Sequence, residues 1–68
     1  MKDLHEMLLN VNDSYADFVA GVERQCNEEP DKKAAVIKAI MENDNIGTDD
    51  ILEICANIHF KKMGFALN

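Results

Sequence analysis

The chain has 68 residues, of which 47% are hydrophobic and 29% are charged. This composition is typical of one small folded domain and argues against general disorder. The formal net charge is −6. Nucleic acids and anionic membranes are polyanions, so this acidic balance excludes both as expected partners. Only one Pro and three Gly occur, which favours long helices, and we expect a single helical domain over residues 1–68.

The cysteine content and the first residues indicate the cellular compartment. Cys26 and Cys55 are too few for the disulfide framework of a small secreted domain. The opening MKDLHEMLLN carries charged groups where a signal peptide needs an apolar core. No apolar run approaches the roughly 20 residues of a membrane span. We therefore expect a cytoplasmic protein with reduced thiols and no membrane partner.

An apolar stripe at helical spacing runs through the first part of the chain. Its members recur every three or four residues: Leu4, Leu8, Val11, Tyr15, Phe18 and Val22. The spacing predicts one long helix over about residues 2–27. The segment NVNDSY interrupts it with residues that favour caps and turns, so the alternatives are a bent helix or two helices that meet near Asn12. Because the stripe keeps its phase, we favour one helix.

Two turn signals divide the rest of the chain. Pro30 ends the first helix and starts a second over about residues 31–43. The buried face of this second helix is expected to hold Val36, Ile37, Ile40 and Met41. The segment NDNIGT then predicts a turn, with Ile46 in the core and Gly47 at a positive φ. Thr48 would cap a third helix over about residues 49–63, followed by Gly64 in the left-handed conformation.

These elements predict an all-α protein: a small three-helix bundle made of a long N-terminal helix and a helical hairpin. The third helix carries more apolar surface than such a bundle covers. Its second side could lie deep between the other helices, or it could contact another chain. We predict a homo-oligomer, most simply a dimer, or a contact with another protein. The predicted partner-binding residues are Leu52, Ala56, Phe60 and Met63, with Leu9 on the first helix.

Two motif-like stretches fail at informative positions. The segment ENDNIGTDDILE resembles a calcium loop with Gly47 at its sixth position. Ile46 then offers no oxygen at the fifth position, and Asp49 occupies the eighth, which needs an apolar residue. The same region has the outline of a helix-turn-helix, but its second helix would present Asp49, Asp50 and Glu53 to DNA. We expect neither calcium binding nor DNA binding.

The remaining reactive side chains do not form a pattern typical of a metal site or an active site. Cys55 and His59 share a helix face, and Cys26 and His5 could complete a set of four ligands. These residues lack the close paired spacing of zinc motifs, so we expect no metal and no cofactor. No Gly-rich phosphate loop and no nucleophile with an evident base occur, so we expect no catalytic residue and no enzyme.

The leading hypothesis is a small acidic interaction or regulatory protein that acts through a helical surface and self-associates. The alternative is an acidic inhibitor, or nucleic-acid mimic, that binds a basic groove of a partner protein. Seven acids in residues 1–30 motivate this alternative: Asp3, Glu6, Asp13, Asp17, Glu23, Glu28 and Glu29. These acids would face water in either case, so the charge alone does not separate the two hypotheses.

Overall fold

The computed structural model describes residues 3–64. It contains four helices and, in that part of the chain, no strand: α1 (Leu4–Leu9), α2 (Ala16–Glu28), α3 (Pro30–Glu42) and α4 (Thr48–Lys62). The predicted all-α class is therefore confirmed. None of these described helices combines the length and the apolar character that crossing a membrane requires.

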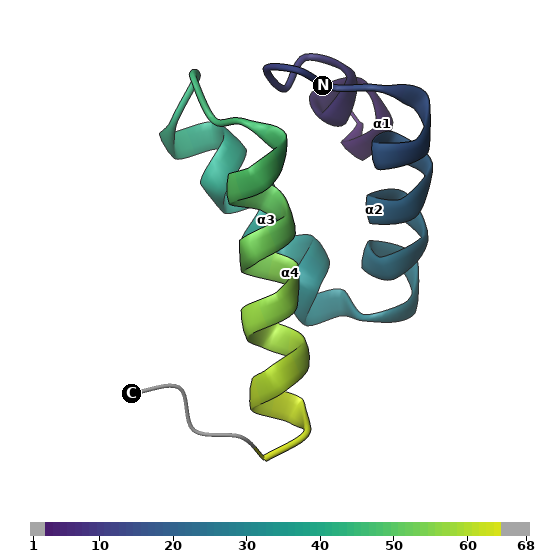
Figure 1. Ribbon diagram of the computed structural model, residues 1–68, viewed down its shortest axis with the longest axis vertical. Helices are drawn as coiled ribbons and strands as arrows, with labels where there is room; N and C mark the ends of the chain where they lie inside the picture. Colours follow the sequence, from purple (N-terminus) through teal and green to yellow (C-terminus); the bar gives the residue numbers. More distant parts are fainter. Residues whose placement is uncertain (1–2, 65–68) are drawn as a thin grey trace.

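The helices form a compact bundle with α1 at one end (Figure 1). A one-residue connection joins α2 to α3, and α4 returns beside α3. α1 packs against α2 and α3 and makes no backbone contact with α4. The core lies between the four helices and contains Leu8, Val11, Phe18, Val19, Val22, Cys26, Val36, Ile46, Ile51 and Cys55.

The prediction of one long N-terminal helix is wrong, because the chain breaks between Leu9 and Ala16. Asp13 adopts a left-handed conformation with φ 62°, which Asp tolerates better than most residues. The Ser14 hydroxyl donates to the Leu9 carbonyl at 2.9 Å and so satisfies the end of α1. The split near Asn12 was the alternative interpretation. The expected start at residue 2 lies outside the described residues.

The two loops, residues 10–15 and 43–47, are tied to each other. The Asn12 backbone N–H donates to the Ile46 carbonyl at 3.2 Å. The Asn12 side-chain amide donates to the Asn45 carbonyl at 2.9 Å, and Asn12 and Gly47 form an isolated parallel bridge. Each loop also buries one apolar side chain, Val11 and Ile46, each 5% exposed. The predicted core position of Ile46 is confirmed.

Several local predictions about α3 and α4 need correction. Met41 was expected in the core and is 73% exposed, because α3 turns this position away from its neighbours. Thr48 is the first residue of α4 and not its cap; Gly47 is the cap, with a φ of −104° in place of the expected positive value. The Asp50 carboxylate accepts the Gly47 N–H at 3.3 Å. Gly64 has a φ of 85°, as predicted.

The contrast between Ile46 and Met41 gives a direct test of the fold. We expect Ile46→Ala to lower the free energy of unfolding by about 2–5 kcal/mol, because it leaves a cavity in the core and weakens the seating of the loop. Met41→Ala is the matched control and should change it by less than about 0.5 kcal/mol. Urea denaturation followed by circular dichroism measures both. Equal losses for the two variants would contradict the placement of these residues.

Candidate functional site

One side of α4 is left uncovered by the rest of the described chain. Leu52, Phe60 and Met63 are 40%, 41% and 58% exposed, and Ala56 is exposed beside them. We call these four residues the α4 face. Their spacing of four, four and three residues places them on one side of the helix. Figure 1 shows the last turns of α4 extending past the connection between α2 and α3.

The fifth predicted contact residue lies elsewhere. Leu9 is 52% exposed, but it belongs to α1, which makes no backbone contact with α4 within residues 3–64. The structure therefore groups Leu52, Ala56, Phe60 and Met63 and leaves Leu9 apart from them. Their role in binding a partner stays a prediction.

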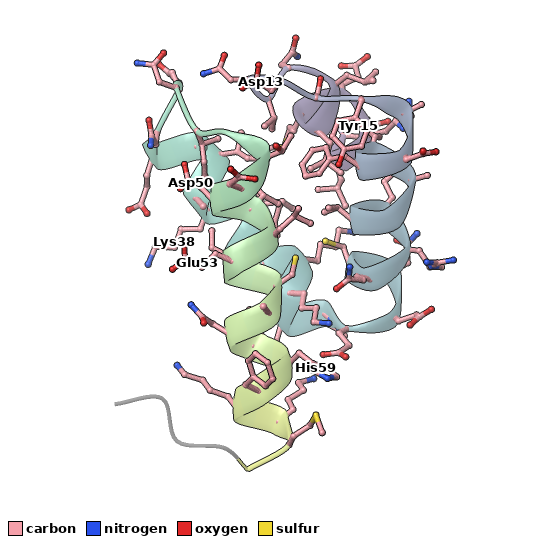
Figure 2. The ribbon with its side chains drawn as sticks, viewed as in Figure 1. Asp13, Tyr15, Lys38, Asp50, Glu53 and His59 are labelled. Atoms are coloured by element: carbon pink, nitrogen blue, oxygen red, sulfur yellow. The ribbon has the colours of Figure 1, made fainter. Side chains whose placement is uncertain are left out.

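A hollow of about 340 Å³ lies against the α4 face. We call it the α4 hollow; it is bordered by residues of α2, α3 and α4, namely Gln25, Lys32, Leu52, Cys55, Ala56, His59 and Phe60. Figure 2 shows His59 projecting from the lower part of α4 toward the side on which α2 and α3 connect. The hollow thus combines an apolar wall on α4 with polar groups from the two neighbouring helices.

Lys32 is the buried polar residue of this hollow and was missed by the sequence analysis. It is only 5% exposed, although lysine is rarely buried unless it is paired. Its Nζ donates to Gln25 Oε1 at 3.1 Å and lies 3.5 Å from Glu29 Oε1. The signal that could have found it is spacing: Lys32 precedes the fully buried Val36 by four residues and so shares its helix face.

Glu29 connects this lysine to the end of α4. Its second carboxylate oxygen, Oε2, lies 3.2 Å from Lys62 Nζ, which is also 3.5 Å from the Asp31 carboxylate. The ion pair with Lys62 is the main reason that the pKa of Glu29 is lowered, and Glu29 in turn raises the pKa of Lys62. One carboxylate therefore serves two ammonium groups, and it holds the C-terminal end of α4 against the α2–α3 connection.

Charge is distributed unevenly along the long axis of the molecule. The end that holds α1 and the two loops carries Asp3, Glu6, Asp13, Asp17, Glu42, Asp44, Asp49 and Asp50. The opposite end carries Arg24, Lys32, Lys33, Lys61 and Lys62 against Glu23, Glu28, Glu29 and Asp31. We call these the acidic end and the basic end. The α4 hollow lies at the basic end, although the whole chain is acidic.

The four side chains considered as metal ligands are not gathered into one site. His5 on α1 contacts Glu23 on α2, with 2.5 Å between Nδ1 and Oε1, whereas His59 lies at the rim of the α4 hollow. Cys26 and Cys55 are both buried in the core as free thiols. Within residues 3–64, no three His, Cys, Asp or Glu side chains are placed to hold a metal ion.

The α4 face gathers exposed apolar side chains, and the α4 hollow adds polar groups from α2 and α3. Exposed apolar side chains gathered in one place mark sites of association, because their removal from water is favourable. Comparison of this chain with protein-family models, with curated proteins and with solved structures gives no match. Function is therefore inferred from the geometry of this surface.

The contact between His5 and Glu23 should make stability depend on pH. The hydrogen bond and the negative charge of Glu23 raise the pKa of His5 above 6.5, and Asp3 and Glu6 act in the same direction. The contribution of the pair is therefore fully present below pH 6.5 and is lost as the pH rises through the pKa of the folded state. We expect Glu23→Gln to be less stable than the wild type at about pH 5.5 and nearly equal to it at about pH 9. Thermal unfolding at the two pH values measures this difference, and a gap that widened toward high pH would contradict the assignment.

The two thiols should be unreactive in the folded protein. Burial, with a smaller effect of the neighbouring Cys55, raises the pKa of Cys26 from 9.0 to about 11, and burial also raises the pKa of Cys55. Because the thiolate is the reactive form, we expect labelling by Ellman's reagent near pH 8 to be on the order of a hundredfold slower than in urea. A thiol that reacted equally fast under both conditions would have to lie at the surface.

Proposed function

We propose that this protein is a small interaction or regulatory protein without catalytic activity, which acts in the cytoplasm by self-association through the α4 face. The observation that carries the proposal is the exposure of the apolar side of α4, where Leu52, Phe60 and Met63 are each at least 40% exposed. A domain this small gains core by pairing, and two-fold dimers are the commonest arrangement. In a two-fold dimer the same face of each copy would meet its counterpart.

The charge distribution supports a second copy as the partner. The net charge of −6 opposes association of two identical chains in general. The α4 face begins with Leu52, within one turn of Asp49 and Asp50, and its other end, with Phe60 and Met63, lies at the basic end of a molecule that is 33 Å long. Exposed charges are screened over about 8 Å at physiological salt, so acids at the α1 end contribute little repulsion across the part of the interface formed by Phe60 and Met63.

Light scattering on the purified protein tests the proposal. We expect the wild type to have twice the mass of one chain at high micromolar concentration, also in ~0.5 M salt, because an apolar contact is not screened. Phe60→Asp and Met63→Asp should each be monomeric, since they place a charge in the interface. Met41→Asp is the matched control, because Met41 is a still more exposed apolar residue on α3, and it should remain dimeric.

A monomeric wild type at that concentration would refute self-association. Circular dichroism of Phe60→Asp and Met63→Asp separates loss of the contact from loss of the fold. A Met41→Asp variant that also became monomeric would move the contact away from α4.

The acidic end supports the second candidate function. We propose, as the alternative, that this end binds a basic groove of another protein and there replaces a nucleic acid. Asp13 lies at its tip in Figure 2, and Asp50 lies in the first turn of α4. Capture of a basic partner by charge would weaken sharply in ~0.5 M salt, whereas the apolar dimer would persist.

A further inference from the structure

The α4 hollow contains the buried ammonium group of Lys32, which has more N–H donors than close acceptors. An ammonium group has three N–H donors. Lys32 Nζ contacts the neutral Gln25 amide at 3.1 Å and the Glu29 carboxylate at 3.5 Å. Close charge-assisted bonds between nitrogen and a carboxylate oxygen measure about 2.7–2.9 Å, so the contact with Glu29 is a long one. Such a buried cation has a donor to offer to an anion that enters the hollow.

Two lysines and two carboxylates lie together beside the hollow, and they differ in burial. Glu29 is shared between Lys32 and Lys62, and the shorter contact, 3.2 Å, belongs to Lys62. Asp31 contacts Lys62 as well, but its side chain is 74% exposed and its charge is largely screened. Lys32 is the most buried of these four groups, so its charge is the one least screened by water inside the hollow.

The other residues of the hollow indicate the size and the polarity of the rest of the ligand. Its α4 wall is formed by Leu52, Cys55, Ala56 and Phe60, which offer apolar contact. Its volume of about 340 Å³ lies at the lower end of the roughly 300–1,000 Å³ that small-molecule sites occupy. A small molecule with one anionic group and an apolar body matches both features.

We propose that the α4 hollow binds a small apolar monocarboxylate, with its carboxylate at Lys32 Nζ and its body against Leu52, Ala56 and Phe60. Gln25 accepts from Lys32 through Oε1, which leaves its side-chain NH₂ as a second donor for the carboxylate. Lysine suits a single carboxylate because its ammonium is a compact point charge. No covalent step is involved.

Ligand binding does not depend on self-association, but both use the same wall. A molecule in the hollow contacts Leu52, Ala56 and Phe60, which a second copy would also contact. Met63 belongs to the α4 face but not to the border of the hollow. Met63→Asp therefore allows the hollow to be tested in a chain that does not pair.

The test is a calorimetric titration of Met63→Asp and of the wild type with sodium octanoate, 1-octanol and sodium acetate. Octanol keeps the apolar body and removes the charge, whereas acetate keeps the charge and removes the body. We expect octanoate to bind at least about tenfold more tightly than either, because a hydrogen bond to a charged group adds to apolar burial. Absence of octanoate binding, or equal affinity for octanol, would overturn the proposal whether or not the protein forms a dimer.

A matched pair of variants tests whether Lys32 is the positive charge that binds the carboxylate of octanoate. Lys32→Met keeps the length and volume of the side chain and should weaken octanoate binding about tenfold or more. Lys33→Met removes an exposed charge from the next position and should leave the affinity unchanged. Circular dichroism reports whether Lys32→Met is folded. If it is not, the titrations with octanoate, octanol and acetate on proteins that keep Lys32 still test the proposal. Equal octanoate affinity of a folded Lys32→Met variant and the wild type would overturn the proposal.

Discussion

The geometry of the basic end depends on one residue, Glu29. Its backbone N–H donates to the Gln25 carbonyl at 3.0 Å at the end of α2, and its own carbonyl accepts the N–H groups of Lys32 and Lys33 at the start of α3. With φ −133° and ψ 104° it is extended, because the residue before a proline avoids helical angles. Its carboxylate contacts Lys32 and Lys62. One residue therefore joins the ends of α2 and α3 and also contacts both the buried lysine and the end of α4.

The size of the chain explains why α4 is covered on one side only. α2 and α3 both contact α4 and bury Ile51 and Cys55 against it. α1 has six residues and lies across the other end of the bundle, so it cannot cover the last turns of α4. A small domain lacks the chain to wrap each helix completely, and the apolar surface that it leaves exposed is available for contacts.

Helical periodicity was enough to predict the all-α class, the α2–α3–α4 order and most of the core. It could not locate the break at Asp13, because Val11 and Phe18 remain in the core on either side of a seven-residue step that also fits two helical turns. The Ser14 side chain donates to the nearby Leu9 carbonyl, but Asn12 donates to the carbonyls of Asn45 and Ile46, more than 30 positions away. Such contacts are tertiary and have no local signal.

The candidate site could be predicted only in part, because local spacing shows one helix face but not the residues that other helices bring to it. The α4 face follows from its own spacing, whereas the α4 hollow also needs Gln25 and Lys32 from other helices. A lysine is ordinarily assigned to the surface by composition, and only its four-residue separation from Val36 hinted at burial.

The tie between Asn12 and Ile46 has a consequence for cooperativity. It joins the two helix–loop–helix halves of the chain through their loops, and each loop also holds a side chain in the shared core. Opening of either half at this end would break these contacts and expose core side chains of the other half. We therefore expect the four helices to unfold as one cooperative unit.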